Sequence, residues 1–269
     1  MKRLSSLTVL SILALGLAIP AYAEKIVVEG STTVLPIAQR AAEEYMNANA
    51  GSDISIRGGG SGVGITSLIE GACDIGDSSR AIKDEELEKA VVRGRSPKAN
   101  VIAMDGIAVI VNSANPIGEL SKKQLKDIYT GKISNWSQVG GSEDKIVVVS
   151  RDSASGTYEA FGELALDKAK VRPDALMQAS NQAVTSVVEK TPGAIGYVGL
   201  AYMSGVKVIK LDGVAASKET VLSKEYKLSR PLFMYTNGKP SGLVKEFIDF
   251  ILSDKGQQLV EEEGYVSIK

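Results

Sequence analysis

The sequence predicts an α/β protein of two lobes, each built on a mainly parallel sheet flanked by helices, with a two-strand hinge between them. Short β-branched runs alternate with helical patterns, which is the order expected of parallel β-α-β units. Two long apolar runs, near 105–111 and 230–236, are predicted to be the strands that cross between the lobes. The first lobe would hold residues 24–108 and 230–269, and the second would hold residues 109–229.

The first lobe is predicted to start with strand–helix units, because β-branched runs such as Ile26–Val28 each precede a helical pattern. Pro36 favours a helix start, and the polar segment 47–51 ends that helix. The expected elements are strands at 25–28 and 54–56, a short strand end with a polar loop at 74–80, and helices at 36–46, 63–70 and 83–89.

The second lobe is predicted to contain a helix over 121–129, capped by Ser121. The run Ile146–Val149 predicts a buried strand that leads to a helix near Tyr158. Residues 173–180 fit either a helix or a loop. The remaining expected elements are a strand at 194–198 and helices at 242–253 and 256–263, which return the chain to the first lobe.

The first residues predict export. Lys2 and Arg3 precede an apolar run from Leu7 to Ile19 and an Ala-x-Ala site, the pattern of a secretory signal peptide cut after Ala23. The apolar run is shorter than the roughly 18 to 20 residues that a membrane span needs. We therefore expect a periplasmic protein.

The charge balance argues against a nucleic-acid or membrane-surface partner. The chain has 31 basic and 32 acidic residues, and loss of Lys2 and Arg3 with the signal peptide leaves a formal charge of about −3. Any anion would have to be captured by local dipoles and a few placed residues.

The chain contains no histidine and a single cysteine, Cys73. The lack of histidine excludes the Ser-His-Asp triad, the Cys–His pair and the commonest zinc sites. One cysteine cannot form an internal disulfide, and Cys73 is expected to be a small buried residue. The Gly-x-x-x-x-Gly-Lys-Ser/Thr loop for nucleotides is also absent. We therefore predict no enzyme activity, no metal and no cofactor.

Three strand–loop–helix junctions, at 30–33, 58–62 and 150–157, carry small hydroxyl residues at the helix start. The first N–H groups of a helix have no partner within it and can bind an anion. Arg151, in the third junction, adds a guanidinium that suits oxyanions. A single junction is more simply a helix cap. Three of them predict convergence on a small tetrahedral anion in a cleft that closes by a hinge motion.

Several motifs occur in an order that a known family shares. They are Gly30–Pro36, Gly60–Gly62, Asp74–Arg80, Leu125–Trp136, Ser153–Thr157 and Pro192–Val198. In these motifs the chain resembles the PstS family, the phosphate-binding proteins of phosphate ABC transporters. The resemblance implies a type II periplasmic-binding-protein fold, extracytoplasmic binding of inorganic phosphate, delivery to the permease subunits of an ABC transporter, and a monomer.

The resemblance also implies a set of ligand residues, matched motif by motif. The implied phosphate-binding residues are Ser31, Thr32, Thr33, Ser61, Ser79, Arg151, Ser155, Gly156 and Thr157. The chain departs from the family pattern at Ser79, where well-known members carry an aspartate that accepts the proton of hydrogen phosphate. The group that accepts this proton could be Asp77, Asp152 or a backbone carbonyl. The selectivity for phosphate over sulfate depends on that acceptor and is left open as well. Arg80 either pairs with Asp77 or reaches the cleft.

Other functions are weighed against phosphate binding. Another tetrahedral oxyanion, such as sulfate or molybdate, would suit the same donors. An exported hydrolase or acyl-transferase would be indicated by the Ser-x-x-Lys pattern of Ser142 and Lys145, which is short and stands without companion motifs. A surface structural protein would use the three junctions only as helix caps.

Overall fold

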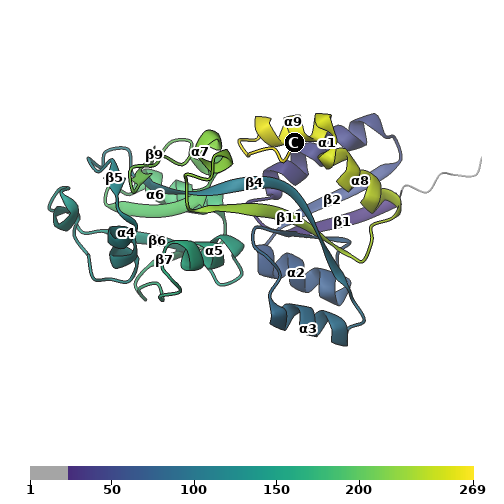
Figure 1. The fold of residues 1–269 in the computed structure, drawn as a ribbon, viewed down its shortest axis with the longest axis horizontal. Coiled ribbons are helices and arrows are strands. Elements are labelled where there is room, and N and C mark those ends of the chain that lie inside the picture. Colours follow the sequence, from purple (N-terminus) through teal and green to yellow (C-terminus); the bar gives the residue numbers. More distant parts are fainter. Residues whose placement is uncertain (1–23) are drawn as a thin grey trace, which may run out of the picture.

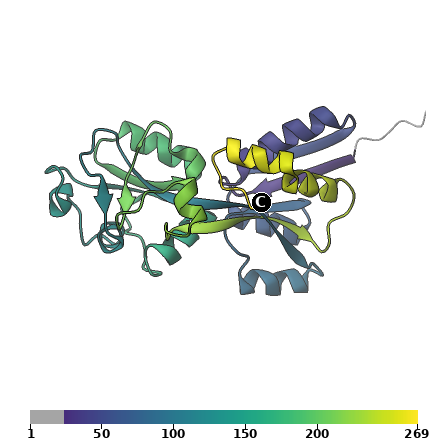
Figure 2. The same cartoon turned by 45° about the horizontal axis from the view of Figure 1, so that its top comes forward.

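A computed structural model describes residues 24–269, so the predicted signal peptide, 1–23, lies outside the described residues. One curled sheet carries helices on both faces (Figure 1). The elements form two groups, which β4 and β11 connect (Figures 1 and 2). We call the group with β1–β3 the first half and the group with β6–β8 the second half. Within residues 24–269, no helix is both long and apolar enough to cross a bilayer.

The main sheet has nine strands in the described residues, in the order β2-β1-β3-β11-β4-β8-β6-β7, with β9 also paired to β4. The neighbours β2, β1 and β3 are parallel, as are β8, β6 and β7. β11 and β4 run antiparallel to each other and to the strands beside them. The strands are β1 Glu24–Gly30, β2 Ser52–Gly58, β3 Ile75–Ser78, β4 Pro97–Val111, β6 Val147–Arg151, β7 Leu176–Gln178, β8 Ala194–Gly199, β9 Lys207–Val208 and β11 Ser229–Asn237, and the separate pair β5 Glu119–Leu120 with β10 Lys210–Leu211.

The helices cover both faces of each half (Figure 1). In the first half, α1 packs with α8 and α9, and α2 packs with α3 and against β1 and β3. In the second half, α6 lies against β6 and β8. The helices are α1 Leu35–Ala48, α2 Ser61–Glu70, α3 Asp84–Val92, α4 Lys122–Tyr129, α5 Gly156–Leu164, α6 Asn181–Lys190, α7 Lys218–Leu222, α8 Gly242–Leu252 and α9 Asp254–Glu262, with short 3-10 helices η1 Trp136–Val139 and η2 Leu200–Tyr202.

β4 joins the two halves. It pairs with β11 as far as Gly106 and with β8 from Ile107 onward. Buried apolar side chains form separate clusters on the two sides of this change of partner. One cluster contains Val28 and Leu232, and the other contains Ile107 and Val148. Each half therefore has its own core, and β4 contributes to both.

The sequence-based expectation did not include β5, β9, β10 or α7. Two further segments differ from it. Residues 176–178 form the edge strand β7, in a segment for which we expected a helix or a loop. β4 begins at Pro97, well before the apolar run near 105. Residues 97–101 are partly or fully exposed, and Lys98 and Asn100 interrupt their apolar pattern, so a search for a buried apolar run does not identify them. Backbone pairing with β11 defines the strand there.

Candidate functional site

The nine predicted ligand residues are all buried, and the most exposed of their side chains, that of Thr32, is only 8% exposed. They lie at or beyond the carboxyl ends of β1, β2, β3 and β6, and most are close to the starts of α1, α2 and α5. This is the edge of an α/β sheet at which ligands bind. The local strand–loop–helix order thus places these side chains at one edge in each half.

The loop before α1 is held by its own hydrogen bonds. The Ser31 N–H donates to the carbonyl of Asp77 at 2.9 Å, and Ser31 Oγ accepts the N–H of Thr33 at 3.1 Å. Gly30 has φ of 143°, and a Cβ there would lie 2.2 Å from the Asp77 carbonyl oxygen. Only glycine allows the backbone at position 30 to come this close to the backbone of Asp77. Ser31 Oγ therefore shapes the loop that presents Thr32 and Thr33.

Hydroxyl groups from the two halves meet across the site. Thr32 Oγ1 accepts a hydrogen bond from Arg151 Nη2 at 3.2 Å, and Thr33 Oγ1 lies 3.0 Å from Thr157 Oγ1. The Gly62 N–H also donates to the Ala154 carbonyl at 2.9 Å. All three predicted junctions thus converge on one place.

Ser61 and Ser79 lie beside the start of α5. Ser61 Oγ is 3.2 Å from Ser79 Oγ and accepts the Ser79 N–H at 3.0 Å. A Cβ on Gly156 would lie 2.3 Å from Ser61 Oγ and 2.8 Å from Ser79 Oγ. Gly156 therefore lets the two halves approach at the point where α5 offers the unpaired N–H groups of its first turn. Ser155 caps this helix by accepting the Tyr158 N–H at 3.2 Å.

Arg151 is fixed by several partners. Its Nε donates to the carbonyl of Gln178 at 3.1 Å, and its Nη2 donates to the carbonyl of Ala179 at 3.0 Å. The Tyr197 hydroxyl accepts the backbone N–H of Arg151 at 3.2 Å. Nη1 is buried and has no partner among the described residues. Burial lowers the pKa of the guanidinium. The guanidinium of Arg151 is therefore held in a fixed position, and its Nη1 remains available to donate to a ligand.

Sequence reasoning did not find two members of this cluster, Asn181 and Arg230. Asn181 Nδ2 donates to Thr32 Oγ1 at 3.2 Å and to Thr33 Oγ1 at 3.0 Å. Arg230 Nη2 donates to Thr157 Oγ1 at 3.0 Å and forms an ion pair at 3.0 Å with Asp105, which is fully buried. For Arg230 a signal was available, because Arg230 and Asp105 are each a single charged residue in an apolar strand, and buried charges need partners.

Asp77, in β3 next to the loop that carries Ser79, has a buried carboxyl group without a hydrogen-bond partner among the described residues. It is 1% exposed, and its Oδ1 has no partner within residues 24–269. Burial raises the pKa of this carboxyl well above its usual value. Asp152, the other carboxyl considered, is partly exposed and accepts the Ala154 N–H at 3.0 Å.

Arg80 lies between the two halves. Its guanidinium forms two hydrogen bonds with Glu86, at 2.7 and 2.8 Å, and its Nε lies 2.8 Å from Glu159 of α5. Lys83 is 3.0 Å from the same Glu159. The alternative pairing with Asp77 is not formed in the described part of the chain. Arg80 instead ties the loop after β3 to the second half.

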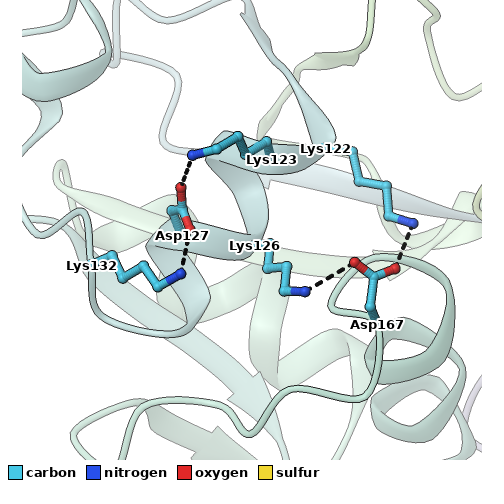
Figure 3. Close-up of a pocket in the computed structure, with 6 residues that line it drawn as sticks. All are labelled: Lys122, Lys123, Lys126, Asp127, Lys132 and Asp167. Carbon is cyan, nitrogen blue, oxygen red and sulfur yellow. Dashed lines mark hydrogen bonds and ion pairs between the residues drawn. The ribbon is translucent and has the colours of Figure 1, made fainter.

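The Ser-x-x-Lys motif and a surface cluster of lysines lie outside the hydroxyl cluster. Ser142 is exposed, and its hydroxyl donates to Asp144 at 2.6 Å, which does not suit an acylated nucleophile. A lysine cluster lies around α4 at the outer end of the second half (Figure 3). Its lysines are partly to fully exposed, and carboxylates bridge them in pairs; the cluster consists of Lys122 and Lys126 with Asp167, and Lys123 and Lys132 with Asp127.

Comparisons with known proteins identify the family. Residues 18–255 match a family model described as a PBP superfamily domain. A Bacillus subtilis protein named phosphate-binding protein PstS is 36% identical over 247 residues, covering 90% of this chain and 80% of the relative. The chain belongs to the PstS family. A second PstS, from Borreliella burgdorferi, is 35% identical over 260 residues, and the match covers 91% of this chain and 91% of that relative.

Two solved structures of phosphate transport proteins are also similar to this chain. A Clostridium perfringens protein assigned as a phosphate ABC transporter substrate-binding protein, solved with bound phosphate, has a TM-score of 0.85 at 37% identity, covering 91% of this chain and 100% of that one. An ABC-type phosphate transport receptor from Vibrio cholerae has a TM-score of 0.74 at 32% identity, covering 90% and 99%. The resemblance to the PstS family and the predicted fold class are confirmed.

Proposed function

We propose that the protein binds inorganic phosphate between its two halves, in the periplasm, and delivers it as a monomer to the permease subunits of an ABC transporter. The name and the bound ligand of its PstS relatives support this function. The halves would act as lobes with the predicted boundaries, 24–108 with 230–269 and 109–229. Their separate cores and the shared strand β4 support a hinge there.

The observation that carries the proposal is a pair of buried guanidinium groups that donate to the converging hydroxyls and keep unpaired nitrogens. Among the described residues, Arg151 Nη1 and Arg230 Nη1 lack acceptors, while their Nη2 atoms donate to Thr32 and Thr157. Asp77 Oδ1, in the neighbouring strand β3, lacks a donor within the same part of the chain, 24–269. Leaving such atoms unpaired costs free energy, which a ligand with matching groups removes. A hydrogen phosphate ion offers several acceptor oxygens and one proton, so it can satisfy both kinds of atom.

The predicted ligands would divide into two roles. Thr32, Ser61, Ser79, Arg151 and Thr157 would contact the anion, together with the N–H groups at Gly156 and the start of α5. The hydroxyl oxygens of Ser31 and Ser155 already accept backbone N–H groups and would hold the loops. Asp77 would share the proton of the ligand, in the place of the aspartate that other family members carry at the position of Ser79.

Calorimetric titration tests this function. A ligand of five heavy atoms at about 1.5 kcal/mol each reaches about 7.5 kcal/mol, a dissociation constant of a few micromolar, and preorganised charged donors would tighten it. Phosphate and arsenate carry a proton near neutral pH, which they would donate to the unpaired oxygen of Asp77, and sulfate has no proton to offer it. Phosphate and arsenate should therefore bind at least about tenfold more tightly than sulfate.

Other outcomes would replace this function. Sulfate or molybdate binding as tightly as phosphate would indicate a different oxyanion. Hydrolysis of a chromogenic phosphate ester would indicate an enzyme. If no oxyanion raised the melting temperature, the three junctions would be helix caps alone.

A further inference from the structure

The side-chain amide of Asn181 faces two threonine hydroxyls in a fixed orientation. Asn181 is the first residue of α6 and is fully buried. Its Oδ1 accepts the N–H of Gly199 at 3.2 Å, which assigns the opposite edge of the amide as the donor. That donor, Nδ2, lies 3.2 Å from Thr32 Oγ1 and 3.0 Å from Thr33 Oγ1.

Arg230 faces the hydroxyls from another direction. Its Nε and Nη2 are held by Asp105 Oδ2 at 3.2 and 3.0 Å. Nη2 donates its second proton to Thr157 Oγ1 at 3.0 Å, and Thr33 Oγ1 lies farther away, at 3.4 Å. Since Arg230 lies on β11 and not on a loop, its position does not depend on the loops that carry the hydroxyls.

A threonine hydroxyl has one proton to donate and two lone pairs that accept. Thr32 Oγ1 accepts from Arg151 and from Asn181. With both lone pairs used, its proton must be donated elsewhere. Thr33 Oγ1 accepts from Asn181 and is only 1% exposed, and Thr157 Oγ1 is the acceptor within reach of its proton among the described residues. In their 3.0 Å contact we therefore assign Thr33 as the donor. Thr157 then accepts from Thr33 and Arg230, and its own proton is also left to donate.

We infer that Asn181 and Arg230 are positioning residues that turn Thr32 and Thr157 into obligate hydrogen-bond donors toward the bound anion, with Thr33 as a relay between them. The inference rests on the proposed phosphate function. Its consequence is that both hydroxyls donate to the anion without first rotating away from another partner, one from each half of the protein. Such preorganisation adds affinity without a further charge.

A double-mutant cycle with phosphate calorimetry tests this inference. Asn181→Ala should weaken phosphate binding about tenfold, the value of roughly one hydrogen bond to a charged group. In a Thr32→Val, Thr33→Val background the same substitution should change the dissociation constant less than twofold, because the hydroxyls that it orients are gone. An equal loss in both backgrounds would overturn the inference.

Asn112→Ala is the matched control. Asn112 is also buried, and its amide donates to the carbonyls of Val188 and Glu189 outside the cluster. It should lower the melting temperature of the unliganded protein and leave phosphate affinity unchanged. If Asn181→Ala did only the same, the role of Asn181 would be structural and the inference would be wrong.

Thr33 provides a second route if Asn181→Ala does not fold. Thr33→Val should weaken phosphate binding about tenfold, and Thr33→Ser, which keeps the hydroxyl, should restore it. Failure of serine to restore affinity would exclude the relay. The wild-type isotherm separates this test from the proposed function, because a wild type that does not bind phosphate refutes that function and not merely the orientation of the hydroxyls.

Discussion

Replacement of Arg151 by alanine is the sharpest test of the proposed site. Three hydrogen bonds, to Gln178, Ala179 and Thr32, hold the guanidinium, and Nη1 remains a buried donor with no partner among residues 24–269. A hydrogen bond to a charged group contributes about 1.5 to 3 kcal/mol. Loss of one such bond should raise the dissociation constant for phosphate by about 10- to 150-fold.

Two further variants separate charge from geometry. Arg151→Lys keeps a positive charge but has no planar fork, so it should bind phosphate with an affinity between those of the wild type and Arg151→Ala. Arg172→Ala is the matched control. Arg172 also has a buried Nη1 without a partner in the described chain, but it pairs with Asp174 in the loop before β7 and has no contact with the cluster. It should leave phosphate affinity unchanged.

The assay is isothermal titration with phosphate at fixed pH and salt, with a thermal unfolding curve for each unliganded variant. Folding of Arg151→Ala should be retained, because the lost hydrogen bonds are offset in part by removal of a buried cation whose pKa burial already lowers. An Arg151→Ala isotherm that matches the wild type within twofold would show that the anion does not bind at this guanidinium.

Four further outcomes are expected. Asp77→Asn should reduce the preference for phosphate over sulfate at least about tenfold in competition titrations, since an amide can donate to a fully deprotonated anion. Because burial raises the pKa of Asp77, the unliganded wild type should lose stability as pH rises through that pKa, and the melting temperature of Asp77→Asn should lack this loss. Glu159→Gln removes the ion pairs of Glu159 with Arg80 and Lys83 between the halves and should speed phosphate release about two- to fivefold in stopped-flow measurements. An unchanged rate would show that these two ion pairs have no role in closure. Gly156→Ala places a Cβ against Ser61 and should weaken phosphate binding at least about tenfold, and scattering curves with saturating phosphate should show a more extended shape than the wild type.

Local patterns predicted the three junctions of the cluster, and the resemblance to the family implied the set of individual ligand residues. Thr32, Ser61 and Thr157 each follow a strand and stand at or near a helix start, so a short stretch of sequence shows both the element order and the hydroxyl. Their convergence could be expected because the carboxyl ends of parallel strands meet at one edge of a sheet. The roles of individual residues were harder to predict, since they depend on which way each hydroxyl points.

Asn181 and Arg230 could not be predicted in the same way. Asn181 follows Ser180, which caps α6, and nothing local distinguishes it from any other polar residue in a first helical turn. Arg230 reaches the cluster from a strand whose partner, Asp105, is distant in the sequence. Only the pairing of β11 with β4 brings them together, and strand pairing at such separation is not encoded in a local pattern.

The sharing of β4 between both cores has a mechanical consequence. A rigid-body rotation between the halves need not break any backbone hydrogen bond of this strand, because its pairing with β11 ends at Gly106 and its pairing with β8 begins at Ile107. Opening would then flex a continuous ribbon elastically instead of unfolding part of it. Amide hydrogens along 97–111 should therefore exchange with deuterium slowly both with and without phosphate, while those of the loops that meet across the cleft should become protected only when the anion binds.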